Sequence, residues 1–154
     1  MLSEEEKKEI DQELSHSPTR QAVVIEALKI IQRHRRWVSD DSLKDLAEYL
    51  EMSLDALDSV ATFYSLIFRR EVGEHVILIC DSVSCWIMGY DTVLDHLKKK
   101  LGIDLGETTA DGKFTLLTIP CLGVCERAPA MIIDRETYGD LTPERIDEII
   151  DKLK

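Results

Sequence analysis

The sequence predicts an α+β protein in which an N-terminal helical bundle is followed by an α/β domain. Apolar residues recur at helical spacing in the first seventy residues, and the spacing changes towards that of β-strands after residue 74. All four cysteines lie in the second half of the chain. We therefore expect two domains, residues 1–70 and residues 71–154, with the polar segment 69–74 as the linker between them.

Four helices are predicted in the first domain, and each begins at a recognisable start signal. The signals are a capping box of Ser3 with Glu6, the pair Ser17-Pro18, Ser39, and Ser53. The second helix contains the very apolar segment 22–31, which indicates a central position. The fourth helix is expected to continue through Ile67. Short connections between the helices favour a small antiparallel bundle.

The second domain is predicted to have the order β-α-β-β-β-α. Residues 75–79 form a short, β-branched and nearly continuous apolar run, which is typical of a buried strand. A helix over residues 86–101 ends in three lysines before Gly102. The remaining elements are a strand over 114–119 after the Asp111-Gly112 turn, a hairpin of 130–133 with 137–139, and a final helix over 142–153.

The composition excludes several classes of function. Acidic residues outnumber basic ones 30 to 19, giving a net charge of −11. This charge argues against nucleic-acid binding, which depends on many contacts from Lys and Arg to phosphate. No apolar run approaches the roughly 18 residues of a membrane-spanning helix. Because the first residues are acidic, where a signal or transit peptide is basic, we expect a cytoplasmic protein without direct membrane insertion.

The four cysteines form two close pairs, Cys80-x4-Cys85 and, 35 residues later, Cys121-x3-Cys125. In a reducing compartment, ligation or redox chemistry is a more frequent use of cysteine than a disulfide. The first pair joins the end of a strand to the start of a helix. The second pair follows a strand, in a segment where Pro120 and Gly123 disfavour a helix. The sequence therefore predicts two loops that converge on one metal site.

The spacing alone leaves three interpretations open, namely a [2Fe–2S] cluster, a structural zinc site, and free or redox-active thiols. It favours the cluster, because zinc ribbons usually use tight knuckles within a small β-ribbon. The sequence contains no C-x-x-C motif, which argues against a thioredoxin-type dithiol. A cluster held by four thiolates is an anion and needs amide donors. We expect these donors from the helix near Cys85 and from the loop Leu122-Gly123-Val124.

Three segments of the sequence carry a family resemblance. They are Ala61-Thr62-Phe63-Tyr64-Ser65, Cys80-Asp81-Ser82-Val83-Ser84-Cys85, and Cys121-Leu122-Gly123-Val124-Cys125-Glu126-Arg127-Ala128-Pro129. In this order they resemble the family of the small iron–sulfur subunit, the E subunit, of NADH-quinone oxidoreductase, the bacterial respiratory complex I. The similarity extends from about residue 5 to the C-terminus, so it covers nearly the whole chain.

The resemblance implies that the second domain is a thioredoxin-like ferredoxin domain carrying one [2Fe–2S] cluster. The implied ligands of this cluster are Cys80, Cys85, Cys121 and Cys125. The implied partner is a larger flavoprotein subunit, which binds FMN and oxidises NADH, so that this chain binds neither. The chain would then be an electron-transfer subunit of an oxidoreductase, held on the cytoplasmic side of the inner membrane through the complex, with the helical domain docking the partner.

Two alternatives to this function stay open. Similar modules belong to NAD-linked hydrogenases and formate dehydrogenases, and the sequence separates these only weakly from respiratory complex I. The alternative from another class is a zinc-stabilised structural adaptor, which would only brace its partner. The sequence contains no G-x-G-x-x-G or Walker motif and no readable catalytic constellation, so no nucleotide site and no catalytic residue are predicted.

Three further groups of residues have ordinary structural interpretations. The scattered histidines His16, His34, His75 and His96 show no ligand spacing, and we expect surface or strand-edge roles. The stripe Thr62–Phe68 is interpreted as core, with a docking face as the functional alternative, since aromatic residues are enriched in interface cores. The basic patch Arg33–Trp37 is expected to finish a helix, with contact to the partner as the alternative.

Overall fold

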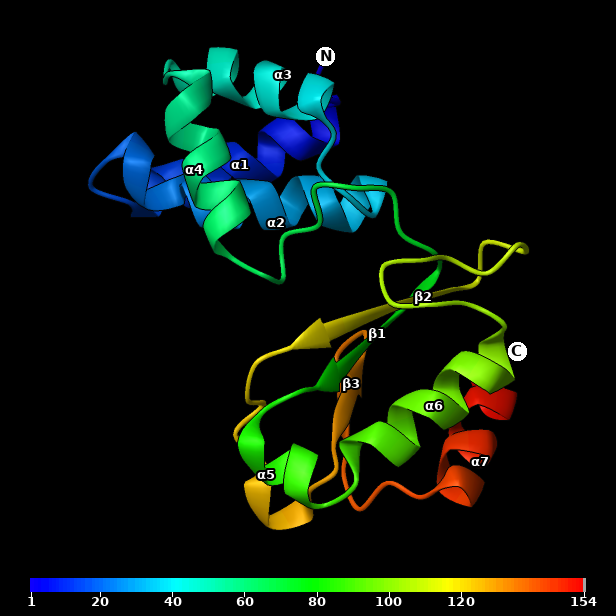
Figure 1. Cartoon of the computed structure of the whole chain (residues 1–154). Coiled ribbons are helices and arrows are strands. Elements are labelled where there is room, and N and C mark those ends of the chain that lie inside the picture. The colour runs from blue at the N-terminus through cyan, green and yellow to red at the C-terminus, as the bar shows by residue number, and fades with distance from the viewer. Residues whose placement is uncertain (154) are drawn as a thin grey trace. The chain divides into compact units, whose positions relative to one another are not determined.

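The computed structural model describes residues 1–153. The chain divides into two compact units, with the boundary between Glu71 and Val72. The first unit is helical, and the second combines helices with a four-stranded sheet, as Figure 1 shows. The predicted α+β class is therefore confirmed.

The first unit contains the four predicted helices. Their bounds are α1 at Glu4–His16, α2 at Val24–Arg35, α3 at Asp40–Leu50 and α4 at Leu54–Phe63, with a 3₁₀ turn, η1, at Arg20–Val23. The capping box is confirmed, because the Ser3 Oγ accepts from the Glu6 amide at 3.1 Å while the Ser3 amide donates to the Glu6 Oε2 at 2.8 Å. Ser39 and Ser53 likewise accept an amide hydrogen bond at the starts of α3 and α4.

Two predicted helix boundaries are wrong. The second helix does not start at Ser17-Pro18, because Thr19 caps the 3₁₀ turn and the α-helix begins only at Val24. The fourth helix ends at Phe63 rather than continuing through Ile67. The Gln32 side chain in α2 donates to the Leu66 carbonyl at 2.8 Å and accepts from the Phe68 amide at 2.7 Å. These long-range bonds satisfy backbone groups that a longer α4 would have satisfied internally.

The interior of the first unit is a single apolar cluster to which every helix contributes. Its fully buried members include Ile10, Leu28, Ile31, Leu43, Leu46, Leu50 and Leu57. One charged side chain is buried beside it, since Glu6 of α1 is only 1% exposed. The Arg35 guanidinium of α2 donates to both Glu6 carboxylate oxygens at 2.6 Å, and also to the Ser42 hydroxyl at 2.9 Å. This pair therefore ties α1, α2 and α3 together.

The basic patch Arg33–Trp37 ends a helix, as predicted, and three of its side chains also form ion pairs with carboxylates of α1. Arg33 and His34 lie in the last turn of α2 and pair with Glu9, as Arg35 pairs with Glu6. Arg36 follows with a positive φ of 71°, the left-handed conformation that ends many helices.

The second unit is built on a sheet with the strand order β2-β1-β3-β4. The strands are β1 at His75–Cys80, β2 at Phe114–Ile119, β3 at Met131–Ile133 and β4 at Glu136–Tyr138. β1 pairs in parallel with β2 and antiparallel with β3, and β3 and β4 form the predicted hairpin. The central position of β1 explains its continuous apolar run, because successive residues from Val76 to Cys80, which point to alternate faces of the sheet, are all buried.

The predicted helix over residues 86–101 is in fact two helices. A short helix, α5, spans Val83–Ile87, and α6 spans Tyr90–Leu101. The chain breaks at Gly89, whose φ of 112° lies outside the range of a helix and is accessible to glycine without strain. The end at Gly102 is confirmed, since that residue adopts a φ of 69° and its amide donates to the Lys98 carbonyl at 2.8 Å.

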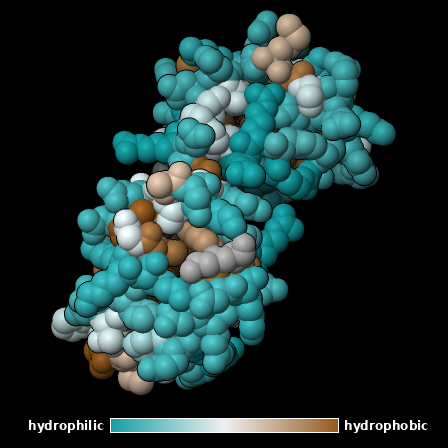
Figure 2. Space-filling view, turned by 90° about the vertical axis from the view of Figure 1, so that its right-hand side faces the viewer, coloured by the Kyte–Doolittle hydropathy of each residue, from teal (hydrophilic) through white to brown (hydrophobic). Residues whose placement is uncertain are grey.

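The final helix, α7 at Pro143–Leu153, packs with α6 against one face of the sheet (Figure 1). Ile77 and Ile79 of β1, Leu97 of α6 and Ile146 of α7 are all buried in this cluster. On the face of the molecule drawn in Figure 2, apolar side chains reach the surface only in small separate patches. No helix formed by residues 1–153 is both long and apolar enough to cross a membrane.

Candidate metal centre

The first cysteine pair lies at the end of the sheet beside α5. Cys80 is the last residue of β1, and its amide donates to the Ala130 carbonyl at 3.0 Å. Cys85 lies within α5, and both cysteines are only 2% exposed. They form a small buried cluster with Ala128 and Ala130. The sheet and the short helix therefore hold these two thiols in fixed positions.

The second pair lies in an exposed loop after β2, as predicted. The Cys121 and Cys125 sulfurs are 3.5 Å apart, and both residues are exposed. Gly123 between them has a φ of 77°, which is accessible to glycine at little cost, and its amide donates to the Cys121 sulfur at 3.3 Å. Cys125 then opens a single 3₁₀ turn, η2 at Cys125–Arg127, instead of a longer helix.

The two pairs meet at one end of the second unit. Cys80 lies next to Cys85, and the neighbouring thiols of Cys80 and Cys125 both act to raise the pKa of Cys85. Ser84 of α5 lies next to Cys125 and acts to lower the pKa of its thiol, so the short helix and the exposed loop meet at the site. Sequence reasoning missed Ser84, although its place directly before Cys85 puts it in the loop-to-helix segment where donors were expected.

The backbone donors come from different places than predicted. Of the two segments expected to supply amides, the loop at Gly123 does so for Cys121. The backbone of Ala130, in the segment that precedes β3, acts to lower the pKa of Cys85, and the Ser84 side chain of the short helix acts to lower the pKa of Cys125. Groups from three separate segments therefore stabilise negative charge on the sulfurs.

The pKa values of Cys85, Cys121 and Cys125 are shifted in different directions. Burial and then the neighbouring Cys80 thiol raise the pKa of Cys85 to about 11. The Gly123 amide lowers the pKa of Cys121, because it stabilises the thiolate. The hydrogen bond between Cys121 and Cys125, whose sulfurs are 3.5 Å apart, raises the pKa of Cys125, because Cys125 keeps the proton that the two sulfurs share. Metal binding must therefore displace protons, because thiolates are the ligating form.

The donor set fits an iron–sulfur centre. Four sulfur ligands select soft metals, and a [2Fe–2S] cluster takes four cysteines. Each iron of such a cluster takes two of the four thiols, and the cysteines of this chain are present as two pairs.

The loop that carries Cys125 is fastened to the segment after β4 through Arg127. The Arg127 carbonyl accepts from the Asp140 amide at 2.6 Å, and its guanidinium donates to the Asp140 carboxylate at 3.0 Å. Gly139 lies so close to Arg127 that an added Cβ would be 2.6 Å from the Arg127 Cβ.

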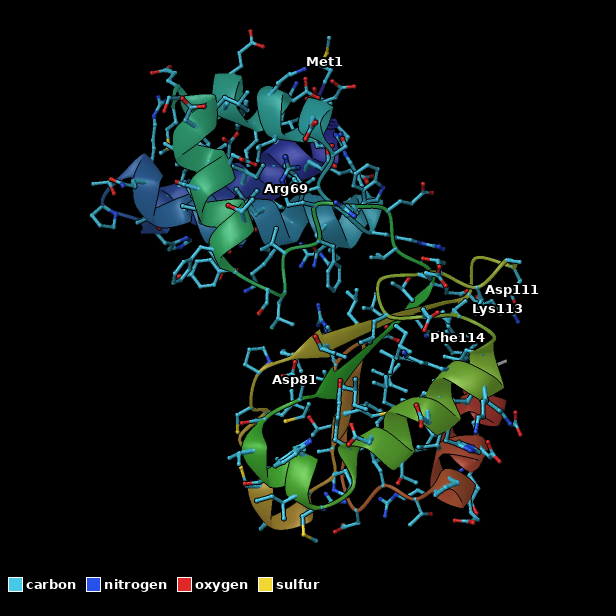
Figure 3. All side chains as sticks on the ribbon, viewed as in Figure 1. Met1, Arg69, Asp81, Asp111, Lys113 and Phe114 are labelled. Atoms are coloured by element: carbon cyan, nitrogen blue, oxygen red, sulfur yellow. The ribbon has the colours of Figure 1, made fainter. Side chains whose placement is uncertain are left out.

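Asp81 is exposed and lies between β1 and α5, beside the end of the sheet that carries Cys80 (Figure 3).

The histidines have ordinary roles, as expected. His34, His75 and His96 each pair with one carboxylate, Glu9, Asp134 and Asp147 respectively. His16 is an exposed residue at the end of α1 and contacts the Gln12 carbonyl. None of the four takes part in the cysteine site.

The interpretation of the Thr62–Phe68 stripe as core is wrong for most of its apolar residues. Phe63 is 79% exposed, and Tyr64 and Leu66 are also exposed, whereas Ile67 is buried in the apolar cluster of the first unit. The reason is the early end of α4 at Phe63. The chain turns there, so the residues that follow no longer continue the buried face of the helix.

Comparison with known proteins defines the class to which this architecture and site correspond. The family of thioredoxin-like [2Fe–2S] ferredoxins matches residues 10–154. The chain belongs to this family, and its cofactor is one [2Fe–2S] cluster. The zinc interpretation, together with the structural adaptor that depended on it, is therefore wrong.

The particular relatives carry a more specific name. The E subunit of the NADH-quinone oxidoreductase of Pseudomonas aeruginosa is 46% identical over 98% of this chain and 91% of the relative. The E subunit of the same enzyme from Escherichia coli K12 is 47% identical over 99% of this chain and 92% of the relative. The resemblance seen in the sequence is thus confirmed at nearly full length.

One solved structure shows the same fold in a larger chain. An NAD⁺-reducing [NiFe]-hydrogenase in the H₂-reduced state matches 89% of this chain with a TM-score of 0.74 and 24% identity. This chain spans only 23% of that hydrogenase chain. At this identity the match describes the fold of the two proteins and not a shared activity.

Proposed function

We propose that this chain is the [2Fe–2S] electron-transfer subunit of an NADH-quinone oxidoreductase and exchanges single electrons with the FMN of an NADH-oxidising partner subunit. The observation that carries this proposal is the identity of 46–47% to the E subunits of such enzymes over nearly the full chain. The proposed ligands are Cys80, Cys85, Cys121 and Cys125, which are the four cysteines that two separate segments bring to one end of the second unit.

Each part of the site has a distinct role in this proposal. The bound cluster supplies one-electron chemistry. Cys80 and Cys85, both buried, anchor it to the sheet, while Cys121 and Cys125 hold it from the exposed loop. The Gly123 amide, which donates to Cys121, and the Ser84 hydroxyl beside Cys125 both stabilise negative charge on these sulfurs. No residue of this chain is proposed to act on NADH or on a quinone.

We further propose that FMN and NADH are bound by the partner, and that the complex holds this chain on the cytoplasmic side of the inner membrane. Two features support this assignment. The sequence has no glycine-rich phosphate-binding motif, and no helix within residues 1–153 is able to span a membrane. The partner is therefore required both as an electron donor and as the attachment to the complex.

The cluster is tested on the purified chain. Visible absorption, iron and inorganic sulfide analysis, and an EPR signal after dithionite reduction are the measurements. We expect two irons and two sulfides per chain and an axial or rhombic EPR signal. A colourless protein with stoichiometric zinc and no sulfide would contradict the proposal.

The exchange with FMN is tested by co-expression with the FMN-containing NADH-oxidising subunit of the same complex. We expect co-elution in size exclusion under reducing, low-salt conditions, and appearance of the cluster's EPR signal or bleaching of its visible absorption when NADH is added. Separate elution, or a cluster that dithionite reduces but the flavoprotein with NADH does not, would contradict it. Gene neighbours encoding hydrogenase or formate dehydrogenase subunits would instead favour those soluble enzymes.

A further inference from the structure

The outer side of α5 is an apolar surface next to the cysteine site. Four of the ten exposed large apolar side chains within residues 1–153 lie in the six residues 83–88. Val83 is 64% exposed, Trp86 60%, Ile87 69% and Met88 60%. We call these four residues the α5 face. Contiguous exposed apolar residues on a soluble protein mark an interaction site more often than chance, whereas scattered ones need no explanation.

The helix geometry places the α5 face opposite the ligand-bearing side of α5. Val83, Trp86 and Ile87 have the spacing i, i+3, i+4, which puts them on one side of the helix. Cys85 points away from that side and is buried with Cys80, Ala128 and Ala130. A partner seated on the α5 face is therefore separated from a ligand cysteine by the thickness of one short helix.

Negative charge borders the α5 face. Asp81 precedes α5 by two residues, Asp91 lies in the first turn of α6, and Glu126 follows Cys125, whose sulfur contacts Ser84 of α5. Within residues 1–153, none of these three carboxylates forms an ion pair, whereas Asp134, Asp140 and Asp147 of the same unit do. The border of the α5 face therefore carries three uncompensated negative charges.

This charge distribution decides which occupant the α5 face fits. A second copy of this chain would place the same three carboxylates opposite one another, because a two-fold interface repeats the same surface on both sides. Like charges across an interface are unfavourable. A partner with an apolar recess and a border of Lys or Arg has the complementary surface instead.

We propose that the α5 face, Val83, Trp86, Ile87 and Met88, is where the electron-transfer partner docks, with basic side chains of that partner meeting Asp81, Asp91 and Glu126. This inference rests on the proposed function, because the FMN-containing subunit is the partner it names. Docking there buries the largest exposed side chains of the second unit and excludes water from the surface above Cys85. It assigns the second unit a partner contact that does not depend on the helical unit.

The test uses the full chain with its cluster and the FMN-containing NADH-oxidising subunit as the binding probe. The variant is the double substitution Ile87→Ser and Met88→Ser, and the matched control is Leu105→Ser, an exposed apolar residue of the same unit outside the α5 face. Kd is measured by biolayer interferometry at fixed salt. The few residues at the centre of an interface carry most of its binding energy, so we expect Kd to rise at least about tenfold in the double variant and less than twofold in the control.

A second variant tests the charged border. Replacing Asp91 with Asn and Glu126 with Gln should slow association and flatten its dependence on salt, since charges at an interface border act mainly on the association rate. Each variant must show the EPR signal and the iron content of the wild type, which excludes loss of the cluster as the cause. An unchanged Kd in the cluster-containing double variant would overturn the inference.

The outcomes separate this inference from the proposed function. If the wild type does not bind the flavoprotein subunit at all, the proposed function fails. If the wild type binds and the double variant binds equally well, only the docking site is wrong. A wild-type homodimer in analytical ultracentrifugation that the double variant dissociates would show that the α5 face serves a second copy, and would also overturn the inference.

Discussion

The helical unit and the cysteine-bearing unit differ in what fills their interiors. In the first, one apolar cluster reaches across all four helices, and a buried ion pair between Glu6 and Arg35 fastens α1 to α2. In the second, an apolar cluster fills the space between the sheet and α6 and α7. The end that carries the cysteines has a separate, much smaller cluster of two thiols and two alanines.

This difference indicates which parts of the chain depend on the cofactor. Alanine and cysteine side chains bury little apolar area, and burial contributes only about 25 cal/mol per Å². The cysteine end of the second unit therefore has little apolar stabilisation of its own, and metal–thiolate bonds supply what packing does not. The helical unit contains no cysteine and has a continuous core, so its folding does not need the cluster.

The largest expected effect is the loss of the cluster from Cys125→Ala. One thiolate is removed and the exposed loop has no spare cysteine, so visible absorption and the EPR signal should disappear or become unstable. The helical unit should keep its circular dichroism signal, because its core contains no ligand. Ser82→Ala is the matched control, since the Ser82 side chain makes no capping hydrogen bond and its loss should leave the cluster unchanged.

The second largest effect is expected from Arg35→Ala, which should lower the stability of the helical unit. Removing the cation leaves the Glu6 carboxylate, whose side chain is 2% exposed, without its partner. We expect the free energy of unfolding to fall by about 3 kcal/mol, measured by urea denaturation followed by circular dichroism. Arg33→Ala removes only an exposed pair with Glu9 and should cost much less stability than Arg35→Ala. Equal costs for the two variants would contradict the structural role of the buried pair.

The contribution of the Glu6–Arg35 ion pair to the free energy of unfolding depends on pH, and the shift of the Glu6 pKa determines the direction of this dependence. Burial raises the pKa of Glu6, but the hydrogen bonds from Arg35 and the Ser3 backbone outweigh it and leave the pKa below its ordinary 4.5. Because the folded-state pKa is lowered, the stabilisation is complete above pH 4.5 and is lost as the pH falls through the folded-state pKa. The difference in stability between the wild type and Glu6→Gln should therefore shrink in acid. A difference that grows in acid would contradict this sign.

A smaller effect on the second unit is expected from Ser84→Ala. The Ser84 hydroxyl acts to lower the pKa of Cys125 and so stabilises negative charge on that sulfur, and its removal should therefore lower the midpoint potential of the cluster. The loss of about 1 kcal/mol corresponds to about 40 mV for a one-electron couple. Ser84→Thr retains a hydroxyl and should stay near the wild type in an EPR-monitored redox titration. A rise in the midpoint of the alanine variant would show that the hydrogen bond does not act in this way.

The smallest effect is expected from Asp81→Asn, in the opposite direction. Asp81 adjoins Cys80, and its negative charge disfavours the addition of an electron, so its neutralisation should raise the midpoint. Asp81 is exposed and solvent screens it, which limits the rise to on the order of 20 mV. The wild type itself should lie nearer about −400 mV than the Rieske range, because all four proposed ligands are cysteines. A wild-type midpoint above zero would contradict this expectation, and Asp95→Asn, distant in sequence from the cysteines, is the control.

Elements whose signals are local were predictable from the sequence. The capping box at Ser3, the glycine end of α6 at Gly102 and the loop containing Cys121 and Cys125 all depend on residues within four positions of each other. The convergence of the two cysteine pairs was predictable as well. A strand end and a strand-following loop meet when two strands are parallel neighbours.

Features that depend on distant contacts were not predictable in the same way. The end of α4 is determined by Gln32, more than thirty residues earlier in the chain, and periodicity within α4 gives no sign of it. The division of the helix over 86–101 follows from Gly89, but a glycine inside an apolar pattern is often tolerated. The sequence pattern does not show that Cys85, rather than Trp86 or Ile87, faces inward. The residues of the α5 face were therefore predicted to belong to an ordinary amphipathic helix.

The parallel pairing of β1 with β2 also affects how the site arises during protein synthesis. In the last register pair, Cys80 stands opposite Ile119, so the partner strand emerges from the ribosome many residues after the first two cysteines. A chain released or stalled before residue 119 has two thiols and no second loop. In the completed fold, burial raises the pKa of the Cys85 thiol to about 11. Since the thiolate is the reactive form, this shift disfavours oxidation of Cys85 only after the segment with Ala128 and Ala130 has covered it.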